Sequence, residues 1–358
     1  MWNGTTSTER VNYYVTVGVD SLLPAIQFME DAIRFPLFQQ EELERERPVV
    51  LGEYDRSESN PFFHLGRATD TLLWSSAYYS RKNILGDRQV ILSTTQEKMR
   101  TIQQRFYLPN NSALILAGDI DARRAFELAE EIFGDWPSGG DPFPEPVPDP
   151  PPLTQSRAIV VEQPVNTVTV SVDWHGPSVT DDPGATYVAD LLGTALANPT
   201  SKFYKALVES GLAFGAGFSY YTQMHVGPIT IQAQTTPDKA LALHRAILAE
   251  VEKFDEPDYL TVDELESAKV QVTIGQIYGR EQPSTFAHTV GFWWAVAGLD
   301  YYLGYVDGMR AVTQDDIGEF ARTYMIGKPH VTGVLIDAAS RAAIELSASD
   351  LLAQEVVQ

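Results

Sequence analysis

The sequence predicts an α+β protein built from two duplicated halves, each an antiparallel sheet flanked by helices, with a proline-rich linker between them. Three observations support this fold class. Short β-branched and aromatic runs alternate with longer amphipathic runs of helical period. Prolines crowd residues 137–156, a composition typical of an extended, semi-rigid linker. The second half repeats the order of elements of the first. With 358 residues and 44% hydrophobic side chains, the chain is large enough for two cores.

These boundaries predict an N-terminal half over residues 1–136, the linker over 137–156, a C-terminal half over 157–346 and a tail over 347–358. In the first half we expect a strand within 10–17 and a buried strand at 113–117, with helices at 20–33, 95–106 and 121–133. In the second half we expect a strand pair within 158–174, strands at 215–221 and 229–235, and helices at 184–196, 238–254 and 261–278. Thr261 and Glu264 have the spacing of a capping box, and Asp119 and Asp337 are expected to cap the helices that follow them.

The internal repeat is carried by matching segments. Glu42-Leu43-Glu44 and Glu264-Leu265-Glu266 each open a long helix, and the spacing from Thr95 to Asp119 equals that from Thr313 to Asp337. On this alignment Gly275 is the counterpart of Glu53, and Ala268 that of Glu46. One copy therefore keeps two carboxylates that the other lacks, which suggests a duplicated fold with its chemistry in one half.

The segment 41–60 carries those two carboxylates. Glu46 and Glu53 lie two helical turns apart and share one helix face with Val49 and Val50. Carboxylates on an apolar face are unusual, because a buried carboxylate has to be paired, hydrogen-bonded or bound to a cation. A solvated acidic helix is the alternative. Pro48 predicts a kink or break between Glu44 and Pro48.

Charge and composition exclude several classes of function. The formal net charge of −22 argues against a nucleic-acid or anionic-membrane partner. Because there is no cysteine, any metal would be held by His, Asp and Glu. No apolar run is long enough for a membrane span, and the first residues do not resemble a signal peptide. We favour the bacterial periplasm or another extracytoplasmic compartment, with any export signal outside these residues.

Three stretches resemble the insulinase and pitrilysin zinc peptidases, including the mitochondrial processing peptidase type. They are NGTTSTERVNYY near the start, ERERPVVLGE in the acidic helix and SKFYKALVESGLAF in the second half. The resemblance implies an inverted zincin, whose single zinc ion is held by the two histidines of HxxEH and a glutamate on a later helix. It implies that Glu53 is that glutamate and that Glu46 supports it as a neighbouring carboxylate that forms hydrogen bonds around the metal site. Asn3, Gly4 and Thr5 would form the edge strand that binds a peptide substrate by β-augmentation. An ordinary polar turn is the alternative for these three residues.

The chain departs from this family in two ways. It has no HxxEH, and its six histidines, His64 among them, are isolated from one another. In the family that motif precedes the Asn-rich segment, so we expect the first half to be N-terminally truncated and the chain alone to be inactive. The positions of an Arg and a Tyr that assist many active relatives are Leu207 and Phe214, and neither side chain donates a hydrogen bond. Tyr220 and Tyr221 are nearby replacements, or core aromatics.

Two functions follow from the resemblance. The first is a zinc-dependent metalloendopeptidase unit that hydrolyses peptides but is incomplete without HxxEH. The second is a non-catalytic partner or scaffold subunit that binds peptide within a heteromeric peptidase. Either way we expect a peptide or unfolded polypeptide as ligand, and a second peptidase-like unit or a homodimer that completes a closed chamber. An acidic binding protein unrelated to peptidases would leave the repeat and the three motifs as coincidence.

Overall fold

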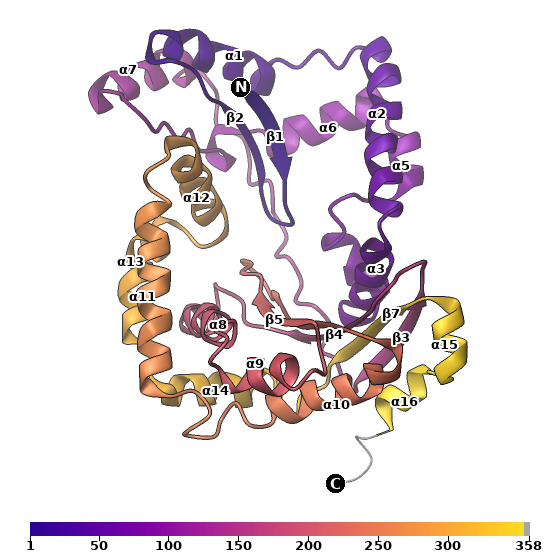
Figure 1. Cartoon of the computed structure of the whole chain (residues 1–358). Helices are drawn as coiled ribbons and strands as arrows, with labels where there is room; N and C mark the ends of the chain where they lie inside the picture. The colour runs from indigo at the N-terminus through magenta and orange to yellow at the C-terminus, as the bar shows by residue number, and fades with distance from the viewer. Residues whose placement is uncertain (354–358) are drawn as a thin grey trace. The chain divides into compact units, whose positions relative to one another are not determined.

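The computed structural model describes residues 1–353 as an α+β protein with two separate sheets (Figure 1). The residues group into two compact units, each assembled from separate stretches of the chain. Unit 1 comprises Met1–Ser57, Asn83–Pro148 and Tyr278–Ala295, and unit 2 comprises Glu58–Lys82, Asp149–Ile277 and the chain from Val296 onward. Among the described residues no helix has both the length and the apolar character needed to cross a bilayer. The boundaries around 137–156 and the internal duplication stay predictions.

Unit 2 is built on a five-stranded sheet. Its strands are β3 (Arg157–Glu162), β4 (Val168–His175), β5 (Gly215–Tyr220), β6 (Pro228–Thr235) and β7 (Val331–Ile336), in the order β3-β7-β4-β6-β5. The expected antiparallel sheet is wrong in one respect, because β3 runs parallel to β7 and the sheet is mixed. The expected strand pair within 158–174 is also not formed, since β7 lies between β3 and β4. A parallel neighbour needs a long crossover connection, and most of unit 2 separates β3 from β7 in sequence.

Helices cover both faces of this sheet. The backbone at Gly333 in β7 faces Thr69 and Leu65 of α3 (Pro61–Leu73) on one side. On the other side, His244 of α10 (Ala240–Val251) is hydrogen-bonded to Thr332, next to Gly333. Because successive side chains of a strand point to opposite faces, α3 and α10 lie on opposite faces of the sheet. The sheet is therefore buried on both sides.

The other helices of unit 2 surround this core and begin where the sequence predicts in several places. Thr261 and Glu264 form the reciprocal hydrogen bonds of a capping box, and Asp337 accepts two backbone N–H groups as a helix cap. These helices are α4 (Ser75–Tyr78), α8 (Pro183–Leu196), α9 (Lys202–Tyr204), α11 (Val262–Tyr278), α13 (Leu299–Ala311), α14 (Gln314–Tyr324), α15 (Ala338–Ile344) and α16 (Ala348–Leu352). Short turns of 3-10 or π type are η2 (Tyr79–Arg81), η4 (Lys205–Glu209) and η5 (Pro237–Lys239).

Unit 1 has a two-stranded antiparallel hairpin, β1 (Trp2–Thr6) and β2 (Val11–Val15), in place of a larger sheet. Its helices are α1 (Leu22–Arg34), α2 (Gln40–Glu58), α5 (Arg88–Leu92), α6 (Gln96–Phe106), α7 (Ala122–Phe133) and most of α12 (Pro283–Val296), with the 3-10 turns η1 (Val19–Ser21) and η3 (Pro109–Asn111). The predicted strand at 113–117 is wrong, because a strand forms only where a neighbour pairs with its backbone. The cap of α7 is Asp121 rather than Asp119.

Candidate functional site

The helix α2 carries both predicted carboxylates on a solvent-exposed face. Glu46 and Glu53 are exposed, and so are Val49 and Val50, at 55% and 38%. The alternative of a solvated acidic helix therefore describes this face, and the carboxylates are not buried against apolar surface. No break occurs between Glu44 and Pro48, since α2 is helical throughout Gln40–Glu58. The carbonyl that loses its helical partner belongs to Glu44, an exposed residue, so the loss leaves no buried polar group without a partner.

A neighbouring side of α2 fixes the helix within unit 1. Tyr54 is 5% exposed, and the guanidinium of Arg88 lies 5.4 Å from the centre of its ring. Arg88 also forms an ion pair with Asp55. Arg47 donates a hydrogen bond of 2.5 Å to the carbonyl of Thr94. Glu53 is thus held on a packed helix while its own carboxylate faces outward.

The described residues do not complete a metal site. Within 1–353, no three His, Asp or Glu side chains come close enough together to hold a metal ion. His64, the histidine nearest to Glu53 in sequence, lies 2.8 Å from the carbonyl oxygen of Glu58 and packs edge-on against Phe63. A zinc ion in a protein takes at least three protein ligands, so this part of the chain does not fit a zinc site by itself.

The hairpin presents one strand edge without a neighbour, because among the described residues β1 pairs only with β2. Hydrogen bonds between Met1 and Thr16, of 2.8 and 3.0 Å, and from Ser7 N–H to Arg10, of 2.8 Å, set the phase of the ladder. In an antiparallel pair, hydrogen-bonded and non-hydrogen-bonded positions alternate. Residues at odd positions of β1 therefore direct their backbone groups toward β2, and those at even positions direct them outward.

This phase divides the three residues predicted to bind peptide. Gly4 directs its backbone N–H and C=O to the open edge, whereas Asn3 and Thr5 direct theirs to β2. The other outward positions are Trp2 and Thr6, which sequence reasoning missed because the phase depends on pairing with β2. The side chain of Asn3 is also involved, since its Oδ1 accepts a 2.8 Å hydrogen bond from the Gly4 N–H.

Gly4 is matched to an aromatic ring across the hairpin. A Cβ at this position would lie 3.2 Å from the ring of Tyr13, which is directly opposite in β2. The hydroxyl oxygens of Tyr13 and Tyr107 are 2.7 Å apart. Burial, and then the hydrogen bond with Tyr13, raise the pKa of Tyr107. Tyr107 therefore stays protonated at physiological pH, and its contact with Tyr13 holds this face of the hairpin.

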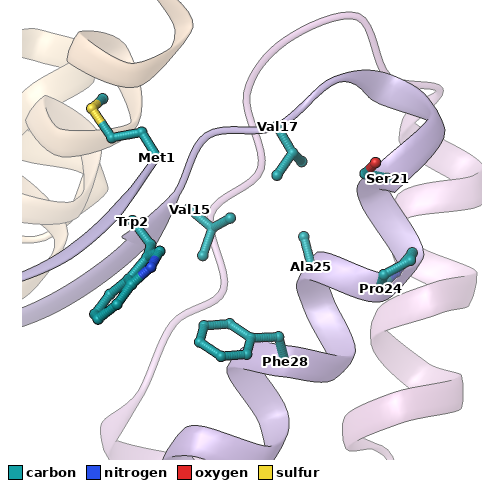
Figure 2. A pocket seen from close by; sticks show the side chains of 8 residues that line it. All are labelled: Met1, Trp2, Val15, Val17, Ser21, Pro24, Ala25 and Phe28. Atoms are coloured by element: carbon teal, nitrogen blue, oxygen red, sulfur yellow. The ribbon is translucent and has the colours of Figure 1, made fainter.

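An apolar pocket of about 320 Å³ adjoins the start of β1 (Figure 2). Figure 2 shows Val15 of the hairpin and Ala25 and Phe28 of α1 around it. The rings of Trp2 and Phe28 are 6.4 Å apart, and both side chains are more than half exposed. The sequence analysis did not identify this pocket, although the apolar run of α1 is its signal.

The two positions that depart from the family differ in their surroundings. Leu207 is fully buried in the π-helical turn η4, and Phe214 is 63% exposed just before β5. Tyr220 donates a 3.0 Å hydrogen bond to the carbonyl of Pro177, so its hydroxyl has a structural role. Tyr221 is 40% exposed. Neither Leu207 nor Phe214 offers a polar group to a ligand.

Comparison with known proteins identifies the class to which this fold and this hairpin belong. A family model described as "Insulinase (Peptidase family M16)" matches residues 1–79, and one described as "Peptidase M16 inactive domain" matches residues 93–272, half of the chain. The chain therefore belongs to the insulinase family, peptidase family M16. The family predicted from the three sequence motifs is confirmed.

Individual relatives agree with this assignment. A protein of Rickettsia felis named "Uncharacterized zinc protease" is 24% identical over 83% of this chain and 70% of its own length. The rat mitochondrial-processing peptidase subunit beta is 29% identical over 37% of this chain and 27% of its own length. The crystal structure of a protease from Helicobacter pylori superimposes with a TM-score of 0.82, at 20% identity, over 94% of this chain and 82% of that one. This last likeness shows the fold.

Proposed function

We propose that this chain is the peptide-binding body of a zinc-dependent metallopeptidase. The observation that carries the proposal is the open edge of β1. A substrate in extended conformation would add a strand there and hydrogen-bond to the backbone of Trp2, Gly4 and Thr6, in the manner of β-augmentation. The N–H of Gly4 now binds the side chain of Asn3, so a substrate carbonyl would displace that side chain.

Glu53 would supply one ligand to the zinc ion. Its carboxylate is exposed on a helix that the buried Tyr54 holds in place, so it is available to a cation without costly rearrangement. Glu46, two turns earlier on the same face, would support the site as a hydrogen-bond acceptor for the ring N–H of a metal-bound histidine. The other ligands and the general base would come from an HxxEH motif, which this sequence does not contain.

A second candidate function is a non-catalytic subunit that binds peptide beside an active copy. Leu207 and Phe214 favour it, because the first is buried in the core and neither donates a hydrogen bond. The exposed Glu46 and Glu53 favour the enzyme, since an inert subunit has no chemical need for them. A second peptidase-like unit, or a second copy of this chain, would complete the chamber in both cases.

The net charge of −22 bears on the substrate class. A strongly acidic protein attracts basic peptides over long range, so we propose basic unfolded peptides as preferred ligands. Association rates of basic and acidic peptides, measured at low and high salt, test this preference. Equal rates at low salt would contradict it.

Zinc content and peptide hydrolysis test the proposed function. They are measured on the protein expressed with any coding sequence upstream of Met1, as wild type and as Glu53→Gln. Glu42→Gln, an exposed acid on the same helix, is the matched control. We expect one zinc ion and activity in wild type and control, and loss of both in Glu53→Gln. A protein that binds peptide but neither binds zinc nor cleaves would establish the non-catalytic subunit instead.

A further inference from the structure

His288 of α12, which is far from the hairpin in sequence, contacts the face of the hairpin opposite to the one that carries the Tyr13 side chain. His288 Nδ1 lies 3.0 Å from the side-chain nitrogen of Asn12 in β2. The ring of Tyr14 packs edge-on against the His288 ring, with centroids 4.4 Å apart. Arg10, just before β2, donates a 3.0 Å hydrogen bond to the backbone carbonyl of His288. Three positions along the hairpin therefore meet at a single histidine.

The register of the hairpin connects these contacts to the peptide-binding strand. Asn12 is directly opposite Thr5, and Tyr14 is directly opposite Asn3. Side chains of directly opposite residues point to the same face of a sheet. His288 therefore packs on the face of the hairpin to which the side chains of Asn3 and Thr5 point. These two residues flank Gly4 in β1.

The hairpin needs such support from outside. An isolated two-stranded hairpin is marginally stable in water. Here one face is held by the Tyr13–Tyr107 contact and the other by His288, so the two contacts lie on opposite faces of the same central positions. A strand edge binds a peptide well only when its backbone groups are fixed before the peptide arrives, because ordering them costs free energy.

We propose that His288 is a positioning residue for substrate binding, which fixes the open edge of β1 through Asn12 and Tyr14. The proposal rests on the proposed function and deepens it, since the ligand is the same extended peptide. His288 does not touch the peptide. It acts through the hairpin, with its Nδ1 accepting from the Asn12 amide and its ring supporting Tyr14.

Measurements of peptide affinity separate the contribution of the Asn12 hydrogen bond from that of the packing against Tyr14. The probe is a fluorescein-labelled synthetic peptide of Lys, Val and Ser residues, titrated with the chain by fluorescence anisotropy. His288→Ala removes both contacts and is expected to weaken binding about tenfold, the upper end for loss of one hydrogen bond with its packing. His288→Asn places an oxygen near the position of Nδ1, and His288→Phe keeps only the ring. Each is expected to restore part of the affinity.

The controls exclude a general loss of structure. Thr285→Ala, at an exposed position one turn earlier on α12, is expected to bind as wild type does. In a double-mutant cycle, Asn12→Ala is expected to have a smaller effect in the His288→Ala background than in wild type. A role limited to folding would produce neither partial rescue by His288→Asn nor this coupling, at temperatures where every variant is folded by circular dichroism.

The outcomes distinguish the two proposals. If wild type binds the peptide and His288→Ala binds it equally well, the positioning role is overturned and the proposed function stands. If wild type binds no extended peptide, the open edge of β1 is not a binding site, and both proposals are overturned.

Discussion

The two sheets of this chain solve the problem of exposed strand edges and faces in different ways. The sheet of unit 2 has helices on both faces, and β4 and β7 at its centre are almost entirely buried. The hairpin of unit 1 is exposed along β1, beside an apolar pocket. Stability is therefore concentrated in unit 2, while unit 1 leaves open the outward backbone groups of β1, to which we propose that a peptide binds. Substitutions in both units test this contrast.

The largest expected effect comes from a carboxyl group buried inside unit 2. Asp173 in β4 is 6% exposed, and the hydroxyls of Thr230 and Ser171 donate hydrogen bonds to it, of 2.6 and 3.1 Å. Burial raises the pKa of Asp173 to about 7, against the lowering effect of the Thr230 hydrogen bond, and the nearby Asp70 raises it further. Burial also raises the pKa of Asp70 to about 6.

The sign of the pH dependence follows from these shifts. Between about pH 4 and 7 the folded chain keeps a proton on Asp173 that the unfolded chain has released, so this group lowers the free energy of unfolding as pH rises. Asp173→Asn removes the charge. We expect the free energy of unfolding of the variant to rise relative to that of wild type across this pH window, by up to about 4 kcal/mol at pH 7 for a shift of three pKa units. Urea unfolding at several pH values measures the difference.

An exposed acid gives the control for this prediction. Asp258→Asn, at the surface of unit 2, is expected to differ from wild type by a constant small amount over the same pH range. If the free energy of unfolding of Asp173→Asn exceeds that of wild type by an amount that does not change with pH, the pH dependence does not come from the charge of Asp173.

The next effect concerns the contact between α3 and the sheet. At Gly333 an added Cβ would lie 2.3 Å from Thr69 Cγ2 and 2.8 Å from Leu65 Cδ1. Gly333→Ala is therefore expected to displace α3 and to cost about 1–3 kcal/mol, the usual range for overpacking. Gly217→Ala, in β5 of the same sheet, meets no heavy atom within 4 Å and is expected to be within about 0.5 kcal/mol of wild type. Equal denaturation midpoints for the two variants would show that α3 is not packed against β7.

The sequence predicts the strands of unit 2 better than their order. Apolar runs locate β3 to β6 because a buried strand is marked by its own residues. The residues of a strand do not show which strands lie next to it. β7, which lies between β3 and β4, comes from far along the chain. The same reason explains the wrong strand at 113–117, whose apolar residues have no pairing partner among the described residues. Local capping signals such as Thr261 and Glu264 succeed because both partners lie within four residues.

In the candidate site, too, local features could be predicted from the sequence and long-range contacts could not. Helical spacing predicts that Glu46 and Glu53 share one face of α2, the structure shows that this face is exposed, and the role proposed for Glu53 comes from the family resemblance. The outward direction of the Gly4 backbone depends on the ladder with β2, which no local pattern of residues encodes. His288 was one isolated histidine among six, and only the packing of α12 brings it to Asn12 and Tyr14. Long-range contacts therefore supply what local sequence cannot.

The smallest expected effect completes the contrast between the units. Val49 lies on α2 between Glu46 and Glu53 and is 55% exposed. Val49→Ser is expected to change the free energy of unfolding by no more than about 0.5 kcal/mol, because surface changes away from special features rarely exceed that value. The same change at Val170, which is 0% exposed in β4, removes two buried methyl groups and adds a hydroxyl, and is expected to destabilise the protein severely. If urea unfolding shows comparable losses for the two variants, the face of α2 that carries Glu53 is covered in the folded protein and is not open to a zinc ion or a peptide.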